Sequence, residues 1–129
     1  MMNTKAKGTN AERQLIHMFW KARWSAMRAA GSGSSRYPCP DILAGNGHRK
    51  VAIEVKTCIG ENQYFAEEEI AQLQLFSRHF GAEAWVAVRF SEGWFFQPVD
   101  DLKKTDKAFV ANKKNLKMVG LVFEEFISN

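Results

Sequence analysis

The sequence predicts an α/β protein with a mixed central β-sheet flanked by α-helices. Segments with helical spacing of apolar residues are interrupted by segments with strand spacing, in the order helix, three strands, helix, two strands. Such an order is typical of helices packed on a mixed sheet. The 129 residues are 46% hydrophobic and 25% charged, which suits one globular domain with its own core. We therefore expect a single domain over residues 1–129.

The first helix is expected over residues 10–24, where apolar residues recur at helical spacing. Thr9 followed by Glu12 fits a capping box and would place the start of the helix next to it. Residues 1–8 are then expected to form a flexible basic arm. The basic residues of this arm are Lys5 and Lys7.

A strand and a β-hairpin are expected next. Residues 25–30 have strand character and lead into the Gly- and Ser-rich run 31–35. Residues 41–44 and 50–57 are apolar runs on either side of Asn46-Gly47, which is a strong hairpin signal.

The second helix is predicted over residues 66–80, with Gly81 placed to end it. Its buried stripe is expected to consist of Ile70, Leu73, Phe76 and Phe80. The acidic run 67–69 falls in the first turn, where the helix dipole favours negative charge, so a structural role is expected for it. Two further strands are predicted over residues 84–90 and 94–99.

The C-terminal part is expected to contain a surface loop and a short helix. The loop is the lysine-rich stretch 103–117, and the helix spans residues 121–127. The chain contains ten Phe and four Trp, more than a small core readily hides. The four Trp are expected in the core or at a dimer contact, and residues 121–127 are a candidate dimer contact.

Composition excludes several classes of protein. No run of about 18 apolar residues exists, so no membrane span is expected. The N-terminus lacks the apolar stretch of a secretory signal, which indicates a cytoplasmic protein. Cys39 and Cys58 are too few for a disulfide framework and lack partners at zinc-site spacing, so free thiols are expected.

The positive charge is concentrated at the two ends of the chain. Residues 1–50 contain nine Lys or Arg against two acids, and residues 102–129 contain six Lys against three. A basic face built from both ends would attract a polyanion such as nucleic acid. The alternative is a solvated surface that is merely basic.

The hairpin carries a candidate catalytic constellation. If it turns about Asn46-Gly47, Asp41 lies opposite Ala52, and Asp41, Glu54 and Lys56 share one face. The opposite face is uniformly apolar and is expected in the core. The diagonal from Asp41 to Glu54 spans roughly 7–8 Å between backbones, which lets both carboxylates converge on one cation.

These residue types are suited to phosphodiester hydrolysis. Converging carboxylates repel each other unless a cation lies between them, and their hard oxygens favour Mg²⁺ or Mn²⁺. Lys56, next along the same face, can neutralise a phosphoryl oxygen. The alternative is the charged outer face of an amphipathic strand. The small, basic residues 28–36 suit phosphate contact better than packing.

These motifs resemble a known family. Pro40-Asp41 followed by Glu54-Val-Lys56 matches the PD…(D/E)xK signature of restriction-endonuclease-like nucleases. Five segments are similar in order and spacing to the archaeal Holliday junction resolvases, over about residues 7–99. They are Gly8-Thr-Asn-Ala-Glu-Arg13, Arg28-Ala-Ala-Gly-Ser32, Pro40-Asp-Ile-Leu-Ala-Gly-Asn-Gly47, Ile53-Glu-Val-Lys56 and Phe76-Ser-Arg-His-Phe-Gly81.

The resemblance implies a restriction-endonuclease-like fold and a homodimeric endonuclease of DNA recombination and repair. Such an enzyme makes paired nicks across a four-way junction, with Mg²⁺ or, in its place, Mn²⁺, and without a small-molecule cofactor or a membrane. The implied metal ligands are Glu12, Asp41 and Glu54. The implied catalytic residues are Lys56, which stabilises the transition state, and Ser32. The residues expected to contact DNA are Arg13 and Arg28, together with Lys5, Lys7 and Arg36 from the basic segments.

Two alternatives remain open at this point. One is another nuclease on the same core, acting on flaps, mismatches or plain duplex DNA. The other is a non-catalytic protein that binds junctions.

Overall fold

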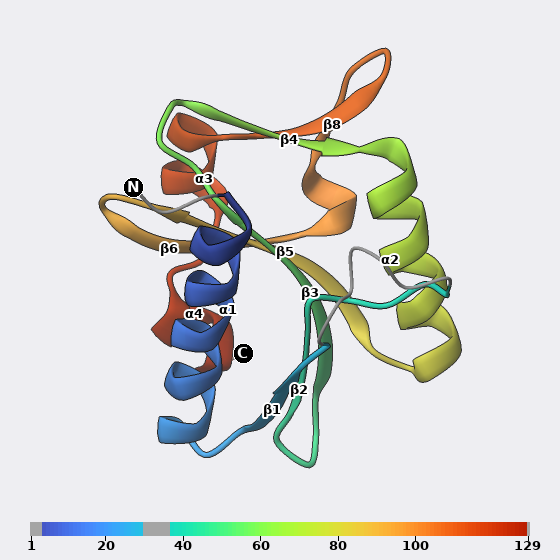
Figure 1. The fold of residues 1–129 in the computed structure, drawn as a ribbon, viewed down its shortest axis with the longest axis vertical. Coiled ribbons are helices and arrows are strands. Elements are labelled where there is room, and N and C mark those ends of the chain that lie inside the picture. The colour runs from blue at the N-terminus through green and yellow to red at the C-terminus, as the bar shows by residue number, and fades with distance from the viewer. Residues whose placement is uncertain (1–3, 30–36, 129) are drawn as a thin grey trace.

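The fold is a five-stranded mixed sheet with α1 and α2 on opposite faces (Figure 1). The computed structural model describes residues 4–29 and 37–128. The strand order is β1-β2-β3-β5-β6, in which β3 and β5 are parallel and the other neighbours are antiparallel. These strands are β1 (Ser25–Arg28), β2 (Ile42–Gly45), β3 (Lys50–Thr57), β5 (Glu83–Phe90) and β6 (Gly93–Pro98). The predicted α/β class is confirmed.

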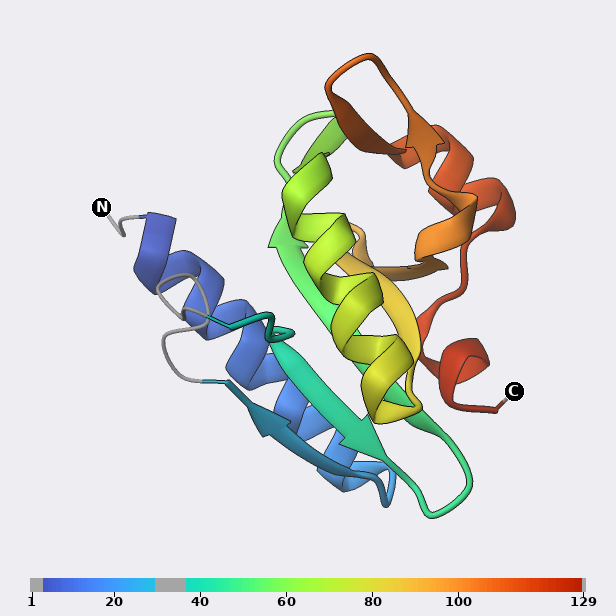
Figure 2. The same ribbon diagram turned by 90° about the vertical axis from the view of Figure 1, so that its right-hand side faces the viewer.

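A second, smaller sheet lies beyond one end of the main sheet, near the start of α2 (Figure 1 and Figure 2). Its strand order is β4-β8-β7 and its pairs are antiparallel. Its strands are β4 (Asn62–Ala66), β7 (Lys103–Lys104) and β8 (Ala108–Asn112). The helices are α1 (Thr4–Lys21), α2 (Glu67–Phe80), α3 (Lys113–Val119) and α4 (Phe123–Ser128), with a 3-10 turn at Val99–Asp101.

The core has two layers, one on each face of the main sheet. On the α1 side, Phe19 and Ile53 belong to one buried cluster, which also takes in α4. On the α2 side, Phe65, Ile70 and Val86 belong to the other. Because both faces of β3 are covered, its apolar residues are buried on both sides. Because β3 is fixed by this packing, the positions of its polar residues Glu54 and Lys56 are also fixed.

The first helix begins earlier than predicted. It runs from Thr4 to Lys21, so residues 4–8 are helical and do not form the flexible arm expected there. Thr9 and Glu12 therefore lie inside α1, and the capping box expected at them is wrong. Because Glu12 pairs with Arg28 of β1, it takes up a tertiary contact instead of a cap.

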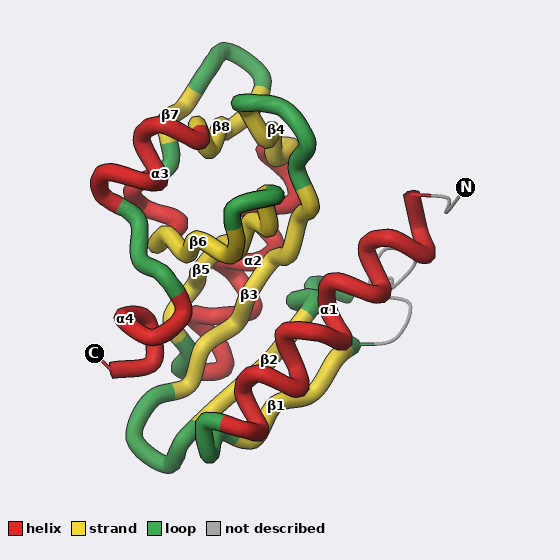
Figure 3. The backbone as a smooth tube through the Cα atoms, turned by 90° about the vertical axis from the view of Figure 1, so that its left-hand side faces the viewer, coloured by secondary structure: helices red, strands yellow, loops and turns green. Residues whose placement is uncertain are grey.

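The lysine-rich stretch 103–117 is not a surface loop. It contains β7, β8 and the first part of α3 (Figure 3). β8 pairs with β4 over its whole length, and the side chain of Asn112 accepts a hydrogen bond from the backbone N–H of Asn115 at the start of α3. The local sequence did not reveal β8 because its partner β4 comes from a distant part of the chain. Leu116 is buried and anchors α3 in the core.

The hairpin and the second helix are confirmed. α2 ends at Gly81, which has the left-handed backbone (φ 79°) that favours glycine. Its buried residues include Ile70 and Leu73 as predicted, but Phe80 is 47% exposed, so that part of the predicted stripe is wrong. Phe76 is partly buried against the α2-side cluster.

Most Phe and Trp side chains that the structure describes are buried or partly buried within the chain itself. Phe123 and Phe126 of α4 are buried with Phe19, so the aromatic side chains of the terminal segment, a candidate dimer contact, pack in the core of their own chain. Of the Phe and Trp side chains that the structure describes, Trp20 and Phe80 are the exposed ones. In the described ranges, no helix is long and apolar enough to cross a membrane.

Candidate active site

The hairpin places Asp41 beside Glu54. Its turn has four residues, and the side-chain oxygen of Asn46 accepts hydrogen bonds from the backbone N–H groups of His48 (2.9 Å) and Arg49 (2.7 Å). Ile42 pairs with Ile53, so the same register continued by one residue sets Asp41 across from Glu54.

This register differs by two residues from the predicted one, in which Asp41 lay opposite Ala52. Because side chains alternate with a period of two, the shift leaves Asp41, Glu54 and Lys56 on one face, as predicted. The backbone N–H of Val55 donates to Oδ2 of Asp41 at 2.8 Å, which ties the two strands together at the site. The two carboxylates are therefore closer neighbours than the sequence predicted.

The environment of Glu54 disfavours its negative charge. Burial is the main cause and the nearby Asp41 carboxylate is the second; together they raise the pKa of Glu54 far above its ordinary value. Asp41 itself is buried. A half-buried acid next to a buried acid is an arrangement that a cation would stabilise.

Lys56 is paired with an acid that sequence reasoning did not connect to it. Its Nζ lies 2.9 Å from Oε2 of Glu69, in the first turn of α2. Burial opposes the charge of Lys56, but its pairing with Glu69 raises its pKa overall. Burial acts to raise the pKa of Glu69, but the hydrogen bond from the Ala66 backbone N–H and the pairing with Lys56 outweigh it. The pKa of Glu69 is therefore lowered. No sequence signal joins residues 56 and 69, because only the folding of α2 over β3 brings them together.

Glu12 reaches the site from α1. Its Oε1 accepts a hydrogen bond from Nε of Arg28 at 2.8 Å. Burial and then the Asp41 carboxylate raise the pKa of Glu12 in spite of this arginine, which shows that Glu12 and Asp41 are electrostatic neighbours. Arg28, expected to contact DNA, is here bound to a predicted metal ligand.

The other predicted site residues are placed only in part. Arg13 is exposed on α1. Lys5 and Lys7 belong to the first turns of α1, close to the part of the chain that carries Glu12. Ser32 and Arg36 lie outside the described residues.

The donor set fits a hard divalent cation, although the side chains are not gathered around one. Within residues 4–29 and 37–128, no three His, Cys, Asp or Glu side chains are grouped closely enough to hold a metal. Glu12 is turned to Arg28, and Asp41 accepts a hydrogen bond from Val55. Burial and then the Asp41 carboxylate raise the pKa values of Glu12 and Glu54, so a nearby cation would favour their charged forms, and carboxylate oxygens are the ligands that Mg²⁺ prefers.

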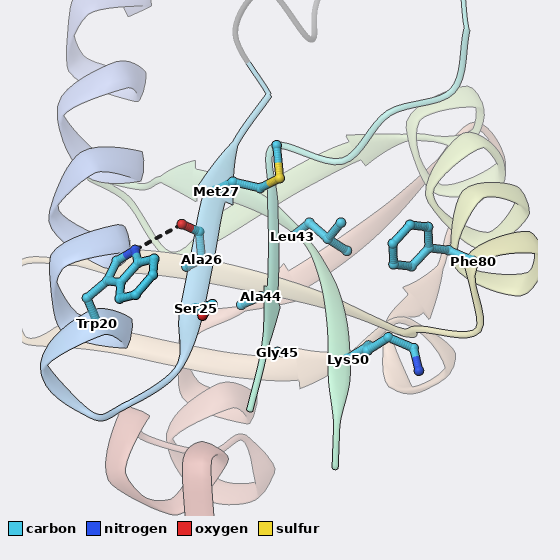
Figure 4. Close-up of a pocket in the computed structure, with 9 residues that line it drawn as sticks. All are labelled: Trp20, Ser25, Ala26, Met27, Leu43, Ala44, Gly45, Lys50 and Phe80. Atoms are coloured by element: carbon cyan, nitrogen blue, oxygen red, sulfur yellow. Dashed lines mark hydrogen bonds between the residues drawn. The ribbon is translucent and has the colours of Figure 1, made fainter. Parts of the chain in front are cut away.

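A separate apolar groove of about 390 Å³ lies away from these acids. Figure 4 shows it between Trp20 near the end of α1 and Phe80 at the end of α2, with Met27 and Leu43 between them. Trp20 is 57%, Met27 61% and Phe80 47% exposed. This face, unlike the acidic cluster, has the composition of a contact surface.

Solved structures share this fold, among them a resolvase and a homing endonuclease. A 1.6 Å structure of the Holliday junction resolvase Hjc of Archaeoglobus fulgidus matches with a TM-score of 0.86 and 43% identity, over 92% of this chain and 98% of that one. The bacterial homing endonuclease I-Ssp6803I matches with a TM-score of 0.53 and 18% identity, over 87% and 77% of the two chains. The fold, with an acidic hairpin at its centre, is that of the restriction-endonuclease-like class.

Sequence comparison gives the family. The chain matches the family model of the archaeal Holliday junction resolvases over residues 3–129. It is 49% identical over 106 residues to the crossover junction endodeoxyribonuclease Hjc of A. fulgidus, covering 81% of this chain and 78% of that protein. It is 28% identical over 127 residues to the Hjc of Methanocaldococcus jannaschii, covering 98% and 91%.

The chain belongs to the archaeal Holliday junction resolvase family, as the sequence motifs predicted. The family match also includes the C-terminal part, in which the resemblance of the motifs faded.

Proposed function

We propose that this protein is an endodeoxyribonuclease that resolves four-way DNA junctions by paired nicks in strands of like polarity. The observation that carries the proposal is the hairpin face on which Asp41 lies across from Glu54, with Lys56 next along the strand. Membership of the resolvase family supports the choice of substrate. The reaction belongs to DNA recombination and repair, and we place it in the cytoplasm.

The acids are proposed to hold magnesium. Glu12, Asp41 and Glu54 would bind Mg²⁺, or Mn²⁺ in its place, which supplies a Lewis acid and a water of lowered pKa. Glu54 has to lose a proton and Glu12 has to leave Arg28 for this purpose. Arg28 would then be released to contact a phosphate.

The protein's own groups would do the remaining work at the phosphate. The backbone N–H of Val55 holds the Asp41 carboxylate in place. The Lys56 ammonium, kept charged by Glu69, is placed to stabilise negative charge that develops on the phosphoryl oxygens. Ser32 is proposed as a further active-site residue on the strength of the motif alone.

DNA binding is proposed to use phosphate contacts from basic residues around the site. Arg13 is exposed on the same helix as Glu12, and Arg28 lies beside it on β1. Phosphate contacts carry no sequence information, which suits an enzyme that recognises the shape of its substrate. The proposed contact residues are Arg13, Arg28, Lys5, Lys7 and Arg36.

A homodimer is proposed because one chain offers one such site and resolution needs two nicks. A two-fold dimer would match the approximate two-fold symmetry of a junction. The apolar groove between α1, β1 and α2 supports a second copy as the occupant: it has three large exposed apolar side chains, and among its described lining residues Lys50 alone is charged. The groove lies apart from the acids, so a copy seated there would leave each site accessible.

The test compares junction with duplex. Wild-type protein and Mg²⁺ are incubated with a four-way junction and, separately, with linear duplexes of the same arms, and nicks are mapped on every strand. Paired, symmetrical nicks in the junction alone are expected. Equal cutting of the duplexes would indicate another nuclease on the same core, and binding without cutting would indicate a non-catalytic junction binder.

A further inference from the structure

The proposed catalytic lysine is held by two side chains of the β4–α2 segment. Its Nζ is 2.9 Å from Oε2 of Glu69, and the two side chains are each about one-third exposed (31% and 32%). The same nitrogen lies 5.9 Å from the ring centroid of Phe65, which is fully buried. Lys56 therefore has a defined position although it reaches toward solvent.

Glu69 is itself fixed. Its Oε1 accepts a hydrogen bond from the backbone N–H of Ala66 at 3.0 Å at the start of α2, while Oε2 faces Lys56. The carboxylate of Glu69 thus has one partner in the backbone and two in the candidate site, Lys56 and, through a side-chain hydrogen bond, Glu54. A capping interaction connects the start of α2 to the ammonium that the reaction needs.

The neighbouring acids of the same turn have other partners. Glu67 pairs with Lys104 of β7, and Glu68 accepts a hydrogen bond from the side chain of Gln72. The helix dipole and local charge are common to all three acids, so they do not explain the contact with Lys56. Among the three, Glu69 alone pairs with a residue of the predicted site.

We propose that Glu69 is a positioning residue that fixes the Lys56 ammonium at the active site. Lysine has a long, flexible side chain, and a reaction that depends on a point charge slows when that charge is misplaced. The inference rests on the proposed nuclease function, since that function gives Lys56 its role. It adds to the signature a residue from α2, outside the hairpin.

The variant Glu69→Gln tests the proposal. Glutamine keeps an oxygen for the Ala66 N–H, so this hydrogen bond at the start of α2 persists, but the charge that holds Lys56 is gone. We expect kcat for junction cleavage to fall by about 10-fold to 100-fold, as for other residues that orient active-site groups. The Kd for the junction should change less than about twofold, because Glu69 is assigned no phosphate contact.

Glu68→Gln is the matched control, since it removes one negative charge from the same turn and leaves Lys56 paired. It is expected to cut at the wild-type rate. A Glu69→Gln enzyme with unchanged kcat would overturn the proposal. So would an equal loss of kcat in Glu68→Gln, which would assign the effect to the helix terminus, or a rise in Kd that accounts for the whole loss.

A second readout does not depend on cleavage or on magnesium. In ¹⁵N NMR of the metal-free protein, the Lys56 ammonium of the wild type should be more ordered than that of the exposed Lys114, and Glu69→Gln should abolish the difference. A Lys56 ammonium as mobile as Lys114 in the wild type would overturn the proposal. A wild-type protein that cuts no junction, with an ordered Lys56, would instead count against the nuclease function and leave the contact established.

Discussion

Glu54 is the residue whose chemistry depends most on what the site binds. Burial and the Asp41 carboxylate both disfavour its charge, and the cation of the same strand, Lys56, is already engaged by Glu69. The second cation–acid contact at the site joins Arg28 to Glu12, so this positive charge too is engaged by an acid other than Glu54. A divalent cation between Asp41 and Glu54, as proposed above, would offset the repulsion between the two carboxylates.

We predict that this arrangement makes the metal-free protein less stable as the pH rises. The pKa of Glu54 is raised to about 9, so the folded state keeps a proton that the unfolded chain loses above the ordinary carboxyl range near 4.5. Stability then falls from about pH 4.5 toward pH 9. Glu54→Gln removes the titrating group, and its advantage over wild type should grow steadily from near zero at pH 4.5 to several kcal/mol at pH 8.

Denaturant unfolding at several pH values, with chelator present, measures this difference. Added Mg²⁺ should raise the stability of wild type at pH 8 and leave the glutamine variant nearly unchanged. A constant difference between the two proteins from pH 4.5 to pH 8 would contradict the assigned titration of Glu54.

Residue-level prediction worked where alternation along a strand decides the outcome. Asp41, Glu54 and Lys56 could be put on one face because a shift of two residues in the register leaves the faces unchanged. The pairing of Lys56 with Glu69 could not be predicted, because the acid is thirteen positions away and its sequence context is fully explained by helix capping.

At the scale of elements, the C-terminal helix completes the core. The ring of Phe126 packs against Trp85 (4.7 Å between centroids) and Phe96 (4.5 Å), and Nη1 of Arg49 donates to its backbone oxygen at 2.6 Å. α4 is short, so this packing and not helix propensity keeps it in place. Its aromatic residues act within the chain.

We predict that Phe126→Ala lowers the free energy of unfolding by about 3–5 kcal/mol, the usual loss for a fully buried aromatic residue. Val122→Ala, just before α4 and 38% exposed, should change it by less than about 0.5 kcal/mol. Chemical denaturation of both variants provides the comparison. A Phe126→Ala protein as stable as the Val122→Ala control would show that α4 does not anchor the core.

Elements were predictable where the pattern was long and failed where it was short. The hairpin and α2 followed from apolar spacing and from Asn46-Gly47 and Gly81. β8 has five residues among many lysines, and its partner β4 is more than forty residues away in the sequence, so local pattern did not reveal it. The start of α1 was misplaced because Thr9 and Glu12 imitate a cap inside a helix.

At the scale of the whole molecule, the described part of the chain presents the acidic site and, apart from it, the apolar groove. The acids lie where the hairpin meets α1 and α2, whereas the groove of Figure 4 opens beside the edge strand β1. The separation allows one face to serve association and the other to serve DNA. Two joined copies would then present two sites to the two strands of a junction.

We predict that the protein is a dimer through this groove. Light scattering at micromolar concentration should give twice the chain mass of 14.7 kDa. Met27→Glu, at a side chain 61% exposed in the groove, should yield a folded monomer that no longer makes paired nicks. Met118→Glu, 74% exposed on α3, is the control and should stay dimeric. A monomeric wild type that still makes both nicks would refute the dimer.

The most direct test of the account is the rate of junction cleavage by Asp41→Asn, measured beside wild type under single-turnover conditions with Mg²⁺. Loss of one carboxylate from the pair should slow cleavage by about 10³-fold, because the proposed metal site loses a ligand. Junction binding should persist or tighten, since a negative charge near phosphate is removed. Cleavage by Asp41→Asn at the wild-type rate would contradict the claim that the Asp41–Glu54–Lys56 face is the catalytic centre.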